Sequence, residues 1–179
     1  GHKSAVMDAC FHPNNQQVAS ASQDGTIRIW NLMEGTHRIV GESKPPGYMC
    51  VTFSPDGKQL AWGGFDSRIV VANTADPTSP TVLRGHQGFV TDLAYTPDGQ
   101  HVLSSSYDSK LKLWNIKTSK EVATLTGHTA AVNSLSISQD GDWAASCSQD
   151  KTVRVWDLQT KTELKVFKGH KSNVMGVSF

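Results

Sequence analysis

The chain has 179 residues, with 17 basic and 16 acidic side chains and a formal net charge of +1. This balance argues against direct nucleic-acid binding, because proteins that bind nucleic acids usually carry a strongly basic face. No apolar run approaches the ~18 residues of a membrane-spanning helix, so we expect no membrane insertion. Cys10, Cys50 and Cys147 are too scattered for a disulfide framework or a paired metal clamp. We interpret them as small apolar residues of an intracellular protein, cytoplasmic or nuclear.

A sequence repeat of 42 residues organises the chain. The string SQDGTIRIWN at 22–31 returns as SYDSKLKLWN at 106–115 and as SQDKTVRVWD at 148–157. A glycine–histidine pair lies upstream of each string at a constant distance. Because such periods mark repeat architectures, we divide the chain into four units and the start of a fifth: 1–42, 43–84, 85–126, 127–168 and 169–179.

Each unit predicts four short strands in the same order. Apolar residues at fixed offsets after the Gly-His position predict a first strand, and a turn such as PDG at 55–57 follows it. A second strand is rich in small residues, as in VLSSS at 102–106. A third strand alternates apolar and polar residues, as in TIRIW at 26–30, and a fourth, such as EVATL at 121–125, leads to the next unit. No segment has a helical period, so we expect an all-β chain.

Four-stranded units with Gly-His and Trp-Asp signatures at this period resemble the WD-repeat β-propeller family. The resemblance covers the whole chain, and three units carry the histidine, the turn aspartate and the tryptophan at identical offsets. It implies antiparallel blades in a propeller of about seven blades, with no cofactor. We therefore expect these residues to be part of a larger propeller whose open ends the rest of the chain completes. The alternatives are a self-sufficient four-bladed form, or two copies that close a ring of eight blades.

Three units combine histidine, serine, aspartate and tryptophan, which raises the question of a catalytic triad. Three copies of one catalytic site in a small domain would be unusual, whereas a structural network is needed once in every blade. An indole N–H only donates a hydrogen bond, a hydroxyl and a neutral imidazole both donate and accept, and a carboxylate only accepts. A Trp–Ser–His–Asp chain therefore gives every member a hydrogen-bond partner. The resemblance implies that this tetrad joins the strands and loops of one blade. The tetrads are His2, Ser20, Asp24 and Trp30; His86, Ser104, Asp108 and Trp114; and His128, Ser146, Asp150 and Trp156.

The unit at 43–84 keeps the period but loses this chemistry. Its tetrad positions hold Lys44, Trp62, Asp66 and Ala72, so only the aspartate remains. A departure from the sequence pattern of the other units is typical of a functional or strained site. The alternative is neutral sequence drift in a blade that tolerates substitutions. We also expect Trp62 to fill the volume that Ala72 leaves.

The resemblance implies a function in protein binding, commonly through the face that carries the Gly-His loops and the turns before the third strands. Positions on this face hold large apolar side chains in the second and third units: Met49, Phe65, Phe89 and Tyr107. Aromatic residues on rigidly held loops are typical of binding hot spots. We predict a non-catalytic scaffold or adaptor that binds proteins or peptides here within a multiprotein complex, with no catalytic, cofactor or metal site. The alternatives are rings that pack against neighbouring loops, an architectural subunit that contacts its assembly through blade edges, and an enzyme whose site lies in further blades.

Overall fold

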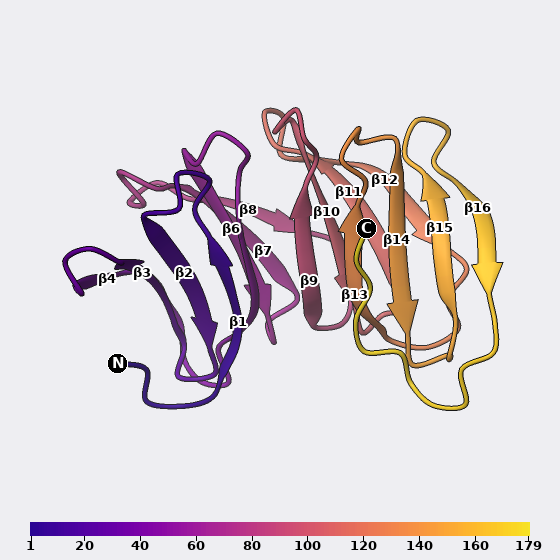
Figure 1. The fold of residues 1–179 in the computed structure, drawn as a ribbon, viewed down its shortest axis with the longest axis horizontal. Coiled ribbons are helices and arrows are strands. Elements are labelled where there is room, and N and C mark those ends of the chain that lie inside the picture. The colour runs from indigo at the N-terminus through magenta and orange to yellow at the C-terminus, as the bar shows by residue number, and fades with distance from the viewer.

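The computed structural model describes residues 1–179, and its 16 strands form four antiparallel sheets of four strands each (Figure 1). We number these sheets blades 1 to 4. Blade 1 contains β1 (Val6–Phe11), β2 (Gln17–Ser22), β3 (Thr26–Asn31) and β4 (His37–Glu42). Blade 2 contains β5 (Tyr48–Phe53), β6 (Gln59–Gly64), β7 (Arg68–Asn73) and β8 (Thr81–Arg84). Blade 3 contains β9 (Val90–Tyr95), β10 (His101–Ser106), β11 (Lys110–Asn115) and β12 (Lys120–Thr126). Blade 4 contains β13 (Val132–Ile137), β14 (Trp143–Ser148), β15 (Val153–Asp157) and β16 (Thr162–Phe167).

The expected all-β class and strand order are confirmed. Consecutive strands pair within each blade, so every connection inside a blade is a hairpin. The turn between the second and third strands has a left-handed residue at one repeated position: Gly25, Ser67, Ser109 and Lys151. No helix is present that is long and apolar enough to cross a membrane.

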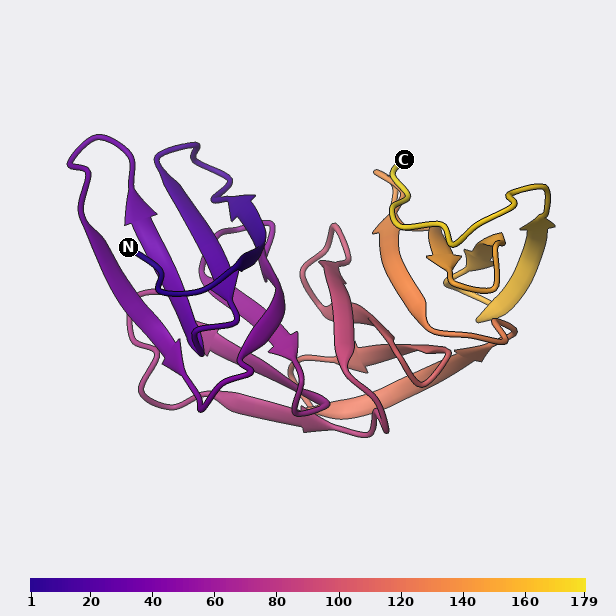
Figure 2. The ribbon, with the colours of Figure 1, turned by 90° about the horizontal axis from the view of Figure 1, so that it is seen from below.

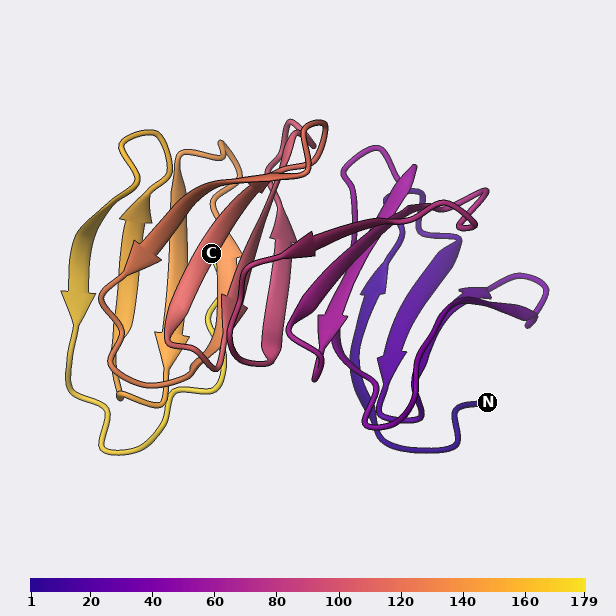
Figure 3. The same ribbon diagram turned by 180° about the vertical axis from the view of Figure 1, so that it is seen from behind.

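The blades stand side by side, with the first strands β1, β5, β9 and β13 packed against one another in sequence. Figure 2 shows these strands on the inside of an arc. The fourth strands form the outer rim, and β8 and β12, which lie at the back of Figure 1, come to the front in Figure 3. This arrangement gathers the Gly-His loops and the turns between second and third strands on one face. We call it the Gly-His face.

Each first strand contains a β-bulge at the same position. The pairing register skips one residue in every blade: Met7, Met49, Thr91 and Asn133. A bulge twists the strand and re-aims the side chains around it. The bulged Thr91 hydroxyl reaches the next blade and donates to the carbonyl of Val132 at 2.6 Å.

The aspartates that follow two of these bulges connect neighbouring blades. The Asp8 carboxylate accepts the backbone N–H of Val51 at 2.8 Å. The Asp92 carboxylate accepts the N–H of Leu135 and the hydroxyl of Ser134, both at 2.9 Å. A buried N–H that faces another blade has no partner in its own sheet, so each carboxylate fills a hydrogen bond that the sheets cannot supply.

The apolar core lies between the blades. Three clusters of buried side chains fill the junctions between blades 1 and 2, 2 and 3, and 3 and 4. Trp114 and Trp156 are among the largest fully buried side chains and face the preceding blade. Each junction is made by the back of one blade and the front of the next, so a blade is covered only where it has a neighbour.

The two outer faces of the arc are uncovered. Phe11 of β1 is 64% exposed, whereas Phe53 at the same repeat position is 7% exposed. Phe167 of β16 is 51% exposed, whereas its equivalent Leu125 is 2% exposed. Figure 2 shows the reason, because blades 1 and 4 are the two ends of the arc and do not meet.

Residues 169–179 correct one expectation, because they form no strand. The segment nevertheless lies along blade 4. The Val174 N–H donates to the Ser148 carbonyl at 3.1 Å, and the Asn133 side chain donates to the Val174 carbonyl at 2.7 Å. The segment takes the place of the next first strand but stays irregular.

Candidate protein-interaction surface

The structure brings the four tetrad residues of blade 3 together as a continuous hydrogen-bond chain. The indole Nε1 of Trp114 donates to Ser104 Oγ at 2.8 Å, and Ser104 Oγ lies 2.7 Å from His86 Nε2. The other imidazole nitrogen, Nδ1, lies 2.8 Å from Asp108 Oδ2. These distances indicate one tautomer, in which Nδ1 carries the proton that goes to the carboxylate.

Blades 1 and 4 repeat this geometry. In blade 1, His2 lies 3.0 Å from Asp24 and 2.7 Å from Ser20, and Trp30 lies 2.8 Å from Ser20. In blade 4, His128 lies 2.7 Å from Asp150 and 2.8 Å from Ser146, and Trp156 lies 2.8 Å from Ser146. The serines are buried and already engaged on both sides, so the network ties each blade together and presents no open nucleophile.

The tetrad aspartates are held as carboxylates. Burial by itself raises the pKa of Asp108, but hydrogen bonds from His86 and from the Gln87 N–H outweigh it and hold the pKa at about 2. In Asp24 and Asp150, hydrogen bonds likewise outweigh burial and lower the pKa. These bonds include the backbone N–H of the residue after the tetrad histidine, which is Lys3 for Asp24 and Thr129 for Asp150. A carboxylate that accepts several N–H and O–H donors is stabilised in its charged form.

A second serine supports the turn of each tetrad, and this role was not predicted from the sequence. The Asp108 N–H donates to Ser106 Oγ at 3.1 Å, and the same bond recurs from Asp24 to Ser22 and from Asp150 to Ser148. The repeated string S-x-D at these positions was the signal. Serine two residues before an aspartate is a common local partner for turn backbone.

Blade 2 replaces the tetrad with other contacts. Asp66 turns to Arg68, whose Nε lies 2.7 Å from the carboxylate. Trp62 is buried against blade 1 in one cluster with Ala72, but its indole Nε1 has no hydrogen-bond partner. Lys44 is exposed. Trp62 thus fills apolar volume without the polar chain that the other blades build.

Three of the four side chains predicted on the Gly-His face, all aromatic, form a row of rings in contact. The ring centroids of Phe65 and Phe89 are 5.0 Å apart across the junction of blades 2 and 3, and those of Phe89 and Tyr107 are 5.5 Å apart within blade 3. Phe89 is 39% and Tyr107 is 47% exposed. We call these three residues the aromatic ladder. Met49 is half-buried at the bulge of β5, two residues after Gly47, whose carbonyl accepts the Phe65 N–H.

The repeat supplies an internal comparison for the ladder. In blade 3 the Tyr107 N–H donates to the Phe89 carbonyl at 2.9 Å, which joins the Gly-His loop to the turn before the third strand. Blades 1 and 4 make the same bond with smaller or polar pairs, from Gln23 to Ala5 and from Gln149 to Ala131. The backbone of this face therefore forms without aromatic side chains, and the rings are an addition.

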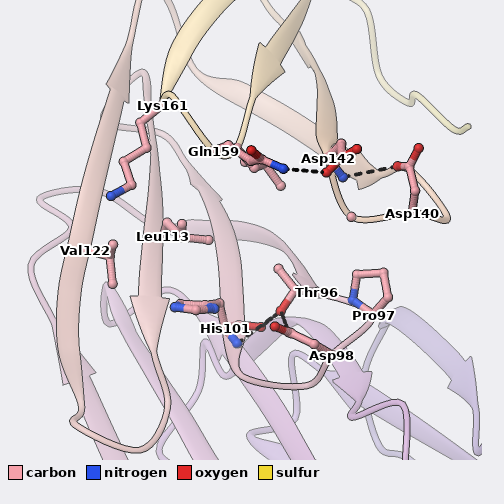
Figure 4. Close-up of a pocket in the computed structure, with 12 residues that line it drawn as sticks. Thr96, Pro97, Asp98, His101, Leu113, Val122, Asp140, Asp142, Gln159 and Lys161 are labelled. Atoms are coloured by element: carbon pink, nitrogen blue, oxygen red, sulfur yellow. Dashed lines mark hydrogen bonds between the residues drawn. The ribbon is translucent and has the colours of Figure 1, made fainter.

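The face opposite the Gly-His loops is different in character. A groove of about 410 Å³ lies there between blades 3 and 4, with Leu113, Val122 and Leu158 among its lining residues (Figure 4). Asp98, Asp140 and Asp142 also line it. The Thr96 hydroxyl bonded to Asp98 and the Ser138 hydroxyl bonded to Asp140 lower the pKa of these two carboxyls, so they remain charged. Nowhere in the chain do three or more His, Cys, Asp or Glu side chains gather to hold a metal ion.

A protein-family model identifies the family of these repeats. The family described as "WD domain, G-beta repeat" matches residues 1–31, 77–115 and 119–157, more than half of the chain. The chain belongs to the WD40-repeat family. The WD40 model leaves residues 32–76 unmatched, the region that includes most of blade 2 and its missing tetrad.

Two matches to curated proteins are short. The chain is similar to Coronin-A of Dictyostelium discoideum, with 56% identity over 36 residues, which is 20% of this chain and 8% of that protein. It is also similar to the target of rapamycin complex subunit wat1 of Schizosaccharomyces pombe, with 40% identity over 47 residues, 25% of this chain and 15% of that protein. The aligned segments thus span less than a sixth of either relative.

Proposed function

We propose that this chain is a non-catalytic interaction platform, and that partner proteins or peptides bind the aromatic ladder and neighbouring Met49. The observation that carries the proposal is the pair of exposed rings of Phe89 and Tyr107, which pack against each other where blades 1 and 4 have Ala and Gln. Rigid aromatic side chains bury a large area at low entropy cost, which makes them effective anchors in interfaces. Membership in the WD40 family supports the same role.

The repeat offers a substitution that tests this function without disturbing the backbone. Phe65→Gln, Phe89→Ala and Tyr107→Gln give blades 2 and 3 residues that blades 1 and 4 already hold at these positions. We expect the triple variant to keep its unfolding midpoint while losing partners in quantitative crosslinking mass spectrometry of the native complex. Gln23→Ala, on the same face of blade 1, is the matched control. An unchanged set of crosslinked partners in the triple variant, with the fold intact, contradicts the proposal.

We further propose that residues 1–42, 43–84, 85–126 and 127–168 are four blades of a larger propeller. Its remaining blades would cover the exposed front of blade 1 at Phe11 and the exposed back of blade 4 at Phe167. The repeat supports this, because the equivalent residues inside the arc, Phe53 and Leu125, are each buried by a neighbouring blade. The unpaired outer edges of β4, β8, β12 and β16 favour a second candidate, an architectural subunit that contacts its assembly through blade edges.

Hydrogen exchange separates the two candidates. A platform gains protection at the Gly-His loops around Phe89 and Tyr107 when its partner is added, whereas an architectural subunit gains protection along β4, β8, β12 and β16. The relative wat1 is named as a subunit of a target of rapamycin complex, which supports a place in a multiprotein complex here too. The free thiols of Cys10, Cys50 and Cys147 support an intracellular location.

A further inference from the structure

The exposed charges that surround the aromatic ladder are predominantly basic. The exposed basic side chains on or next to the Gly-His loops and turns are Lys3, Lys44, Arg84, Lys110, Lys151, Lys168 and Lys171. The tetrad aspartates also lie on this face, but their side chains are almost completely buried and engaged in hydrogen bonds. Of the two exposed carboxylates there, Asp66 is paired with Arg68, which leaves Glu42.

The opposite face has a nearly balanced set of exposed charges. Its exposed carboxylates are Glu34, Asp56, Asp76, Asp98, Asp140 and Asp142, against Arg38, Lys58, Lys117, Lys120 and Lys161. The excess of exposed basic side chains therefore lies on the Gly-His face, although the net charge of the chain is only +1. Such an excess favours the approach of an acidic partner to that face.

Three exposed lysines lie in the loops and turns that carry or adjoin the ladder. Lys44 precedes Gly47, whose carbonyl accepts the Phe65 N–H at 3.4 Å. Lys110 follows Tyr107 by three residues and begins β11. Lys151 follows Gln149 by two residues, and the Gln149 side chain donates to the Tyr107 hydroxyl at 3.2 Å.

The polar end of the ladder is also suited to an acceptor. The Tyr107 oxygen accepts a hydrogen bond from Gln149, so its own O–H remains available to donate. A carboxylate or a carbonyl oxygen is the group that such a donor binds. The apolar rings and the O–H of Tyr107 thus run from blade 2 toward Gln149 of blade 4 on the face that carries the exposed lysines.

We infer that the ladder binds an acidic protein segment that carries an apolar anchor residue. The anchor packs on Phe65, Phe89 and Tyr107, and the acidic residues beside it face Lys110 and Lys151, with one oxygen accepting from Tyr107. This inference rests on the proposed function and specifies the chemistry of the partner. Nucleic-acid bases are the less suitable occupant, because the three rings are tilted by 56° and 47° onto one another and present no parallel platform for stacking.

The test begins with a displayed library of random short peptides, selected on the intact chain. Binders are then counted on the variant that combines Phe65→Gln, Phe89→Ala and Tyr107→Gln. We expect the peptides that need the ladder to be net acidic and to contain an aromatic or large aliphatic residue. Ladder-dependent peptides without an acidic bias overturn this inference and leave the proposed function standing. Enrichment that ignores the ladder, or no enrichment, overturns both.

A matched pair of lysines then tests the charge. Lys151 on the Gly-His face and Lys161 on the opposite face are both exposed and both adopt a left-handed backbone, with φ of 69° and 62°. Asparagine tolerates this conformation, so Lys151→Asn and Lys161→Asn make the same change in charge on two faces. We expect Lys151→Asn to weaken the best acidic peptide about two- to five-fold at low salt, and Lys161→Asn to leave it unchanged. Equal effects of the two variants, or displacement of the peptide by oligothymidine, overturn the inference.

Discussion

Trp114 donates its indole N–H to the hydroxyl of Ser104 at 2.8 Å, inside blade 3, where both side chains are buried. Trp62 in blade 2 is buried to the same degree, but its N–H has no partner. One protein thus contains two buried tryptophans of similar environment that differ in one hydrogen bond. This contrast allows the tetrad to be measured apart from the apolar packing around it.

Replacement of each tryptophan by phenylalanine separates the two contributions. Trp114→Phe loses apolar contacts and also leaves Ser104 without its donor, whereas Trp62→Phe removes an N–H that is already unpaired. We expect Trp114→Phe to lower the free energy of unfolding by about 1–2 kcal/mol more than Trp62→Phe. Equilibrium urea unfolding measures both. Equal losses would show that the hydrogen bond contributes nothing beyond packing.

Removal of the serine at the centre of a tetrad should be more costly. Ser104→Ala orphans the Trp114 N–H and one nitrogen of His86, and we expect a loss of roughly 2–3 kcal/mol. Ser105→Ala is the control, because Ser105 is equally buried and bonds the Thr91 hydroxyl, which keeps its other bond to Val132. We expect a smaller loss for Ser105→Ala. Thermal unfolding of the two variants compares them directly, and a reversed order contradicts the tetrad's role.

The Asp92 bridge between blades 3 and 4 predicts a pH dependence. Burial of the carboxyl, only partly opposed by the bonds from Leu135 and Ser134, raises the pKa of Asp92 to about 6 from 3.8. The folded state therefore binds the proton more tightly than the unfolded state, so this contribution to stability is present below pH 4 and is lost as the pH rises through 6.

Comparison with Asp92→Asn isolates this effect. We expect the free energy of unfolding of the wild type, relative to the variant, to fall by up to about 2 kcal/mol between pH 4 and 6.5 and to stay level above that. The tetrad aspartates have lowered pKa values and act with the opposite sign below pH 4, outside this window. A difference that is flat across pH 4 to 6.5 contradicts the assignment.

The uncovered face of blade 1 predicts association of the isolated chain. Phe11 is exposed where its equivalent Phe53 is buried by a neighbouring blade. We expect Phe11→Ser to reduce self-association in sedimentation velocity without lowering stability, since the ring has little to lose. Phe53→Ser should cost roughly 3–5 kcal/mol, in line with the loss of a buried phenylalanine. If Phe11→Ser associates more strongly than the wild type, the exposed apolar face of blade 1 does not drive the association.

The sequence by itself determined the strands, their order in each blade and the membership of the tetrads. These follow from local rules that repeat every 42 residues, such as alternation in TIRIW and turn residues at fixed offsets, and a repeated pattern can be checked against its own copies. The positions of the ladder residues on one face also followed from the repeat, because equivalent positions lie at equivalent places in each blade.

Only the tertiary structure decided what happens between blades. The contacts of Phe65 with Phe89 and of Asp8 with Val51 join residues of different units, and their distances depend on how one sheet packs on the next. The unpaired N–H of Trp62, the groove of Figure 4 and the irregular path of residues 169–179 have the same origin. Local sequence patterns specify hydrogen bonding within a sheet, whereas packing between sheets depends on the side-chain volumes of both faces at once.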